Sequence, residues 1–375
     1  MQTRVAEMLG VEFPILAFSH CRDVVAAVTN AGGFGVLGAV GHSPKTLEID
    51  LTWIDDEVKG KPYGVDLLLP HRHTQRDDGP TIDADTVRQL LPARQQEFVE
   101  EILRRYNVPE LPDEVEARVG AINVSEGRVG NLLDVAFGHP IRLVASALGD
   151  PPMSLVERAH DAGVLVAALA GTAEHARRSN AKGVDLIVAQ GTEAGGHTGT
   201  ISTMVLVPEV VDAVAPTPVL AAGGIGRGSQ IAAALALGAE GVWCGSIWLT
   251  TAEAETDPTV QQKFLVASSS DTVRSRSLTG KPARMLRSAW TDAWEDEGAP
   301  PALPMPDQTM LTAVAQQRIN RHAGDVDSGA HDLATYFVGQ IVGSMNVVRP
   351  ARQVMLDLVT EYADAATRFV DQLGE

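Results

Sequence analysis

The chain has 375 residues, of which 45% are hydrophobic and 21% charged, and its mean hydropathy is +0.01. Its 30 Lys and Arg residues stand against 48 Asp and Glu residues, which gives a net charge of −18. This composition predicts a globular protein with a large core and excludes a mostly disordered chain. The acidic balance argues against nucleic acid or an anionic lipid surface as partner, although local cationic pockets remain compatible with it.

The cysteines, the N-terminus and the longest apolar runs indicate the compartment. Cys21 and Cys244 are too few for a disulfide framework or a cysteine-based zinc site, and they favour a reducing environment. The N-terminal residues lack the apolar run of a signal peptide, and no run reaches the roughly 20 residues of a membrane span. We therefore expect a cytoplasmic protein without a membrane segment, and a homodimer is one of the oligomeric states left open.

Short apolar runs alternate with helical patterns over most of the first 245 residues. Eight of these runs are predicted as strands buried on both faces, at residues 14–18, 34–39, 63–69, 141–147, 164–169, 185–190, 218–222 and 241–245. The clearest helix begins at Ser43-Pro44, a cap followed by proline, and ends near Val58. Because parallel neighbours need a helical crossover, eight such units predict an α/β fold, a closed (β/α)8 TIM barrel. A doubly wound open sheet is the alternative.

Two stretches interrupt this alternation. Residues 71–118 are polar and helix-prone, and we predict a helical insertion after strand 3 that also supplies the third helical layer, with helices at 86–91 and 95–106. The pattern from residue 257 onward is helical and irregular. We therefore predict a barrel domain over residues 1–256 and a helical C-terminal extension over 257–375, packed on the barrel.

The first glycine-rich run, residues 33–38, matches the pattern G-x-G-x-x-G. The dinucleotide fingerprint needs a strand before the glycines and a helix that begins within them. Here a helix precedes the glycines, which themselves lie in an apolar strand. A nicotinamide-binding Rossmann site is therefore the less favoured interpretation.

The second run follows the sixth strand and reads Gln-Gly-Thr-Glu-Ala-Gly-Gly-His, at the end of the barrel where active sites lie. Gly195 and Gly196 would let the backbone approach a flat ligand, and Gln190 offers both a donor and an acceptor. His197 titrates near neutral pH and is the candidate catalytic residue. We interpret Glu193 as a solvated loop residue.

Glycines also follow the seventh and eighth strands. Ala222 ends the seventh strand and is followed by Gly223 and Gly224, and Gly245 and Ser246 follow the eighth strand. Backbone N–H groups at such turns bind anions, and barrels commonly bind phosphate between these two loops. We predict a phosphate site here, with simple tight turns as the alternative. His71 and His73 lack the spacing of a metal motif, so we expect no metal.

Together these motifs resemble the FMN-dependent nitronate monooxygenases, formerly called 2-nitropropane dioxygenases. The resemblance is carried by residues 14–17, 30–38, 64–70, 190–199, 221–224, 238–246 and 279–284. The E-A-G-G-H loop with A-A-G-G-I also occurs in FMN-dependent enoyl-acyl carrier protein reductases and related quinone reductases. The resemblance therefore specifies the cofactor more closely than the substrate.

The resemblance implies one FMN across the barrel mouth, with its phosphate on the two later glycine loops and His197 facing its reactive edge. It implies cofactor contacts from Ala17, Phe18, Asp66, Gln190, Gly195, Gly196, Ala222, Gly223, Gly224, Gly245 and Ser246. The chain also departs from the family. The first-strand loop reads Ala-Phe-Ser-His-Cys where relatives usually read Ala-Pro-Met, and Asp66 stands where relatives often carry asparagine. An acid there would change the hydrogen bonding toward the flavin and repel an anionic substrate.

The function implied is oxidation of alkyl nitronates by dioxygen to a carbonyl compound and nitrite, with His197 taking a proton from a neutral nitroalkane. One alternative is an FMN-dependent reductase that uses NAD(P)H to reduce an enoyl thioester or a quinone. A barrel that binds a phosphate ligand without catalysis is a third possibility. The partners expected are a small nitronate or nitroalkane substrate and dioxygen.

Overall fold

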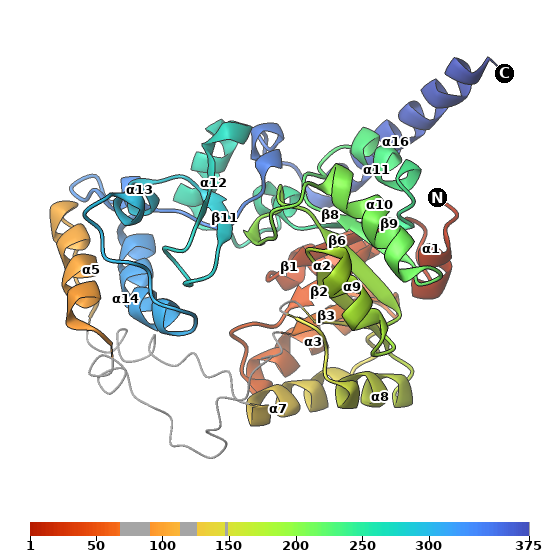
Figure 1. Cartoon of the computed structure of the whole chain (residues 1–375), viewed down its shortest axis with the longest axis horizontal. Coiled ribbons are helices and arrows are strands. Elements are labelled where there is room, and N and C mark those ends of the chain that lie inside the picture. Colours follow the sequence, from red (N-terminus) through yellow and green to blue (C-terminus); the bar gives the residue numbers. More distant parts are fainter. Residues whose placement is uncertain (68–90, 113–125, 147–148, 375) are drawn as a thin grey trace.

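The computed structural model describes residues 1–67, 91–112, 126–146 and 149–374 (Figure 1). Eight parallel strands close into a barrel in the order β1-β2-β3-β4-β5-β6-β8-β9. Their bounds are β1 (Ile15–Ser19), β2 (Phe34–Gly38), β3 (Gly64–Leu67), β4 (Leu143–Ser146), β5 (Leu165–Ala170), β6 (Leu186–Gln190), β8 (Val219–Ala222) and β9 (Gly241–Cys244). Because β9 pairs with β1, with Trp243 opposite Leu16, the sheet is closed. The TIM-barrel prediction is confirmed, and the open sheet is wrong.

Side chains alternate between the barrel interior and the layer of helices around it. The interior cluster includes Leu16, Phe34, Val36, Leu143, Ala145, Ala167, Leu186, Val188, Leu220, Ala222 and Trp243. Helix α1 (Arg4–Leu9), which the sequence analysis missed, adds Val5 and Leu9 to this cluster. It begins after Thr3, whose side chain accepts the Ala6 N–H, and ends at Gly10 with φ +70°. Its two apolar side chains, four residues apart, therefore plug one end of the barrel.

Helices surround the barrel in the expected alternation. Their bounds are α2 (Arg22–Asn30), α3 (Pro44–Val58), α7 (Glu126–Phe137), α8 (Met153–Asp161), α9 (Ala173–Asn180), α10 (Thr203–Val214) and α11 (Gly228–Ala236). Helix α3 begins as predicted, because Ser43 and Thr46 form a capping box and Pro44 occupies the first turn. The third helical layer was expected within residues 71–118. That placement is wrong, because α7 follows this stretch and packs on α3.

The glycine run of residues 33–38 lies on β2, not in a phosphate-binding turn. A Cβ on Gly35 would lie 2.4 Å from the Val25 carbonyl oxygen, and one on Gly38 would lie 2.6 Å from Nδ1 of His20. These glycines let helix α2 and the first loop approach the strand closely. The run is therefore explained by packing, in agreement with the interpretation that the sequence favoured.

The insertion and the C-terminal extension pack against each other beside the barrel. Helix α5 (Ala93–Arg105) confirms the helix expected at 95–106 and lies next to α14 (Asp307–His322) (Figure 1). The Arg318 guanidinium donates to the carbonyl oxygens of Val108 (2.9 Å) and Pro109 (3.0 Å). The remaining elements here are α12 (Pro258–Val266), α13 (Ala289–Glu295), α15 (Ala330–Leu333), η2 (Ser269–Asp271) and η3 (Gln340–Ser344). The helix expected at 86–91 lies almost entirely outside the described residues.

The extension also contains strands, which the helical interpretation missed. Strands β10 (Thr272–Ser275) and β11 (Ala283–Leu286) pair antiparallel, and β11 also pairs with β7 (Gly196–His197). His197 lies opposite Ala283, so residues almost ninety positions apart share one ladder. The glycine loop after β6 is therefore held by the C-terminal extension.

The last helix, α16 (Ala351–Leu373), returns to the barrel and packs on α11 and α2 (Figure 1). A Cβ on Gly228, at the start of α11, would lie 2.2 Å from the Leu358 carbonyl oxygen. Only a short 3-10 helix, η1 (Ser246–Thr250), follows β9 directly, so α16 takes the position of the eighth barrel helix. No helix in the described ranges, α16 included, is long and apolar enough to cross a membrane. The boundary at 256/257 and the homodimer remain predictions.

Candidate active site

Predicted site residues from four different strands meet at one end of the barrel. Phe18, Asp66, Gln190 and Ala222 occupy the last inward-facing positions of β1, β3, β6 and β8, as the strand pairings show. Ala17 faces the helical layer and is fully buried, so only its backbone is available to a ligand. This end is formed by the carboxyl ends of the strands, where barrel enzymes place their active sites.

Aromatic side chains line part of this mouth. The rings of Phe18 and Trp243 stack with centroids 6.2 Å apart, and His20 meets Phe18 edge-on at 5.1 Å. A Cβ on Gly245 would lie 3.8 Å from Phe18, so the loop after β9 borders the same surface. Trp243 was not among the predicted site residues, because its apolar run indicated only a buried strand.

The glycine loops after β6 and β8 lie in direct contact. Gly223 has φ +95°, and a Cβ on it would lie 3.0 Å from the Gly191 carbonyl oxygen and 3.1 Å from the Ala194 nitrogen. Gly224 has φ +71°, and a Cβ on it would lie 3.2 Å from the Cβ of Glu193. Both positions therefore need glycine for conformation and for space. The structure places the two predicted loops side by side.

A C-terminal segment that the sequence analysis missed fastens these loops. The Gly339 N–H donates to Ser246 Oγ (2.8 Å), and the Gln340 N–H donates to the Glu193 carbonyl oxygen (2.9 Å). A Cβ on Gly195 would lie 2.8 Å from the carbonyl carbon of Val338. The segment therefore joins the loops after β6 and β9. The apolar residues of this segment show neither helical nor strand periodicity, so the sequence does not predict the contact. Gly339 is the one local feature in the segment that indicates a close approach of the backbone.

Glu193 is not the solvated loop residue that the sequence suggested. Its carboxylate accepts hydrogen bonds from the Thr203 N–H (3.0 Å) and from Thr203 Oγ1 (2.9 Å) at the start of α10. A negative charge at a helix N-terminus is stabilising, so this contact anchors the glycine loop to α10.

His197 is half-buried on β7, and its ring centroid lies 6.2 Å from that of Phe337. Its Nδ1 atom is buried and has no hydrogen-bond partner within the part of the chain that the structure describes. Burial lowers the pKa of His197; the backbone of Pro282 opposes this shift, and the charge of Lys281 adds to it. Because an ordinary histidine already titrates near 6.5, a lowered pKa leaves most of the imidazole neutral at pH 7.

Two arginines donate hydrogen bonds to the two sides of the glycine loop after β6. The Arg284 Nε–H donates to the Thr192 carbonyl oxygen (2.8 Å), and Arg274 donates to the Thr198 carbonyl oxygen (3.0 Å). The two arginines lie opposite each other on β10 and β11, and burial together with the Arg274 charge lowers the pKa of Arg284, while Glu193 raises it. These guanidinium groups add positive charge beside the loop of a strongly acidic protein.

These groups fit a flat ligand with a phosphate group, as a flavin nucleotide is. The glycine turns after β8 and β9 expose successive backbone N–H groups, which bind anions. The Phe18 and Trp243 rings give an apolar surface, and two buried polar atoms, Asp66 Oδ1 and His197 Nδ1, have no partner among the residues that the structure describes. Buried polar atoms usually find a partner, so a ligand that supplies one suits this mouth.

A cluster of possible metal ligands lies elsewhere at this end of the barrel. Cys21, Asp23 and Glu255 each place a ligand atom within 4.8 Å of the others. Cys21 Sγ donates to the Glu253 carbonyl oxygen (3.0 Å), and burial raises the pKa of the thiol. Exposed acidic groups such as Glu255 commonly cluster without a metal, so we assign no metal to this cluster. His71 and His73 lie outside the described residues.

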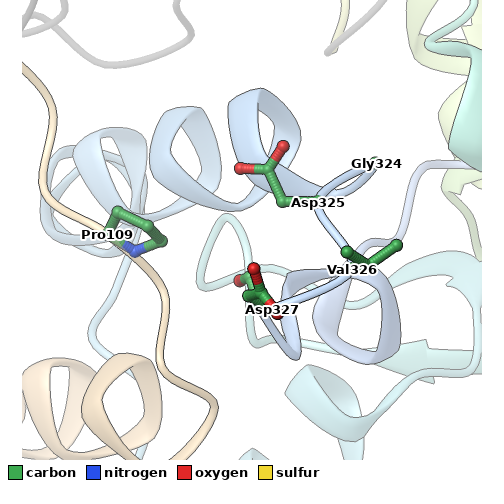
Figure 2. Close-up of a pocket in the computed structure, with 6 residues that line it drawn as sticks. Pro109, Gly324, Asp325, Val326 and Asp327 are labelled. Carbon is green, nitrogen blue, oxygen red and sulfur yellow. The ribbon is translucent and has the colours of Figure 1, made fainter.

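A hollow in the surface lies apart from the barrel mouth. Figure 2 shows it between Pro109, after α5, and residues 324–328, between α14 and α15. Its carboxylates belong to Asp325 and Asp327, and Asp325 is paired with His322 (2.6 Å). It lies where the insertion meets the extension and shares no residue with the predicted site.

Comparisons with known proteins agree with this architecture. The family model described as nitronate monooxygenase matches residues 3–361. A protein of Mycobacterium tuberculosis (strain H37Rv), whose name assigns it only to the monooxygenases, is 65% identical over 97% of each chain. A Staphylococcus saprophyticus protein named as a probable nitronate monooxygenase is 28% identical, over 95% of this chain and 99% of its own.

Two solved structures superpose on nearly the whole chain. A nitroalkane oxidase from Streptomyces ansochromogenes superposes with a TM-score of 0.78 at 27% identity, covering 97% of this chain and 99% of its own. FabK from Thermotoga maritima superposes with a TM-score of 0.73 at 26% identity, covering 99% of both chains.

The fold and the comparisons define a (β/α)8-barrel oxidoreductase. Within that class, the chain belongs to the nitronate monooxygenase family.

Proposed function

We propose that the protein binds FMN and oxidises alkyl nitronates with dioxygen to a carbonyl compound and nitrite. The observation that carries this proposal is the half-buried His197 on the glycine loop, opposite Ala283, in a chain that matches the nitronate monooxygenase model over residues 3–361. Burial lowers the pKa of this histidine, which favours its neutral form. When bound, FMN would supply the two-electron acceptor that the oxidation needs.

The loops after β8 and β9 are suited to hold the phosphate. Backbone N–H groups of Gly223, Gly224, Gly245 and Ser246 would bind its oxygens. Ser246 Oγ accepts the Gly339 N–H, which leaves its O–H free to donate to the phosphate. Gln190, Gly195, Gly196 and the backbone of Ala17 and Phe18 would line the ring system.

His197 would act on the substrate. A neutral imidazole can take the proton from the carbon next to the nitro group of a neutral nitroalkane, which leaves the nitronate anion. The positive charges of Arg274 and Arg284 favour an anionic substrate at this end of the barrel. Substrates are thus small nitroalkanes or their nitronates.

The first test uses the purified protein with its flavin, mixed anaerobically with alkyl nitronates while absorbance is followed near ~450 nm, the usual region for oxidised flavin. Bleaching by nitronates, followed by nitrite formation with oxygen, is the expected result. No bleaching and no nitrite would refute the proposal.

The role of His197 is tested by His197→Asn. We expect kcat/KM for a neutral nitroalkane to fall by about 100-fold or more, the range for loss of a general base, and a smaller loss for preformed nitronate. His175→Asn, at an exposed position on α9, is the matched control. Unchanged turnover of both substrates by His197→Asn would exclude a catalytic role.

A second candidate is a reductase that uses NAD(P)H to reduce an enoyl thioester or a quinone. It is favoured by glycine loops that serve both chemistries and by the similarity to FabK over 99% of both chains. Rapid anaerobic bleaching by NADH or NADPH, without bleaching by nitronates, would favour this reductase instead.

A further inference from the structure

Asp66 is a buried acid at the mouth of the barrel. Its neighbours on β3, Val65 and Leu67, face the helical layer, so its side chain points inward between Gly38 of β2 and Ala145 of β4. The residue is 1% exposed, and its Oδ1 atom has no hydrogen-bond partner in the described ranges of the chain. Predicted flavin contacts occupy the same layer of inward positions.

No charge compensates this carboxyl group within the described part of the chain. The inward positions of β1, β2 and β4 carry no ionisable side chain. The titratable groups nearest on those elements are His20, bonded to the Gly38 carbonyl oxygen (2.9 Å), and His42, paired with Asp50. Burial raises the pKa of Asp66 well above its ordinary value.

An ionised carboxylate at this position would be a buried, uncompensated charge, which proteins avoid by retaining the proton. The protonated group has an O–H donor that needs an acceptor. A flavin offers carbonyl oxygens and ring nitrogens along its edge. An asparagine at this position would donate through its amide at every pH, whereas aspartic acid donates only when protonated.

We propose that Asp66 binds FMN as a neutral acid, donating its O–H to the ring system, so that FMN binding takes up a proton whenever the empty site has lost one. This inference rests on the proposed function. It makes flavin affinity depend on pH, with retention in acid and release as the pH rises through the Asp66 pKa. A neutral Asp66 also places no negative charge beside an anionic substrate, contrary to the repulsion expected from the sequence.

The test measures the dissociation constant of FMN by flavin fluorescence from about pH 5.5 to about pH 8.5. We compare the wild type, Asp66→Asn, and Glu255→Gln, which removes an exposed carboxylate from the same end of the barrel. In the wild type, Kd should rise about tenfold per pH unit above the pKa of the empty site. Asp66→Asn should lose this slope, and Glu255→Gln should keep it. Ionisation of the flavin phosphate affects all three proteins equally.

An equal slope in Asp66→Asn and wild type would overturn the inference. If Asp66→Asn does not fold, calorimetry of FMN binding to the wild type in buffers of different ionisation enthalpy measures the proton uptake instead. Uptake of up to one proton per FMN at high pH supports the inference. No uptake over the whole pH range overturns the inference. If the wild type binds no FMN at any pH, the proposed function fails and this inference fails with it. A pH-independent wild-type Kd refutes the inference alone.

Discussion

Gly339 connects the C-terminal segment to the predicted cofactor loops, and replacing it with alanine tests this connection. A Cβ there would lie 2.6 Å from the Glu193 carbonyl oxygen, 3.1 Å from the Gly195 nitrogen and 3.2 Å from Ser246 Oγ. An ordinary van der Waals contact of a Cβ begins at 3.4 Å, so the segment must move by roughly 0.8 Å. That displacement would break the hydrogen bond from Gln340 to Glu193, which is 2.9 Å long.

The cost of Gly339→Ala follows from two terms. Overpacking in a tight site costs about 1–3 kcal/mol, and a lost hydrogen bond adds about 1 kcal/mol. We therefore expect a loss of about 2–4 kcal/mol. If all of it falls on FMN binding, Kd rises by about 30-fold to about 700-fold, and any remainder lowers the free energy of unfolding.

The assay combines urea unfolding of the FMN-free protein with FMN titration by fluorescence. Gly324→Ala is the matched control, because no atom lies within 4 Å of a Cβ built at that position, which is remote from the site. The control should match the wild type in both measurements. If Gly339→Ala also matches it in both, the segment does not fasten the loops and our reasoning is refuted.

Three further predictions concern burial. Because the folded protein holds the Asp66 proton while the unfolded chain ionises near 3.8, the free energy of unfolding should fall by up to about 1.36 kcal/mol per pH unit above about pH 4. Urea unfolding of FMN-free Asp66→Asn should lack this slope, and an identical slope would mean that Asp66 is ionised. Gly35→Ala forces a contact with the Val25 carbonyl and should destabilise the protein by about 1–3 kcal/mol or more, measured by thermal melting; a neutral effect would reopen the cofactor interpretation of that run. Burial raises the pKa of Cys244 to about 12, so iodoacetamide at about pH 8 should label it only in denaturant, and mass spectrometry of the folded protein would reveal any exception.

The strands and the glycine loops were predictable because their signals are local. A strand buried on both faces appears as an apolar run, and Ser43-Pro44 marks a helix start within a few residues. Since the carboxyl ends of parallel strands meet at one end of a barrel, the contact between the Gly191 and Gly223 loops also followed from the order of the strands.

The contacts that the sequence did not reveal join distant residues. Glu193 meets Gln340, and His197 pairs with Ala283, although a two-residue strand has no periodicity to detect. Glu193 itself looked solvated because charged residues usually are, and only the start of α10 shows what it binds. The burial of Asp66 was invisible for a related reason, since a single polar residue in an apolar run can face either side of a strand.

Helix α16 is the last element of the chain and completes the ring of helices around the barrel, between α11 and α2. During synthesis, all eight strands leave the ribosome more than a hundred residues before this helix does. Until then, the apolar surface around Gly228 that Leu358 covers remains open to water. A nascent or truncated chain that ends before Ala351 would therefore expose an apolar surface on α11 and α2, of the kind that chaperones and proteases recognise.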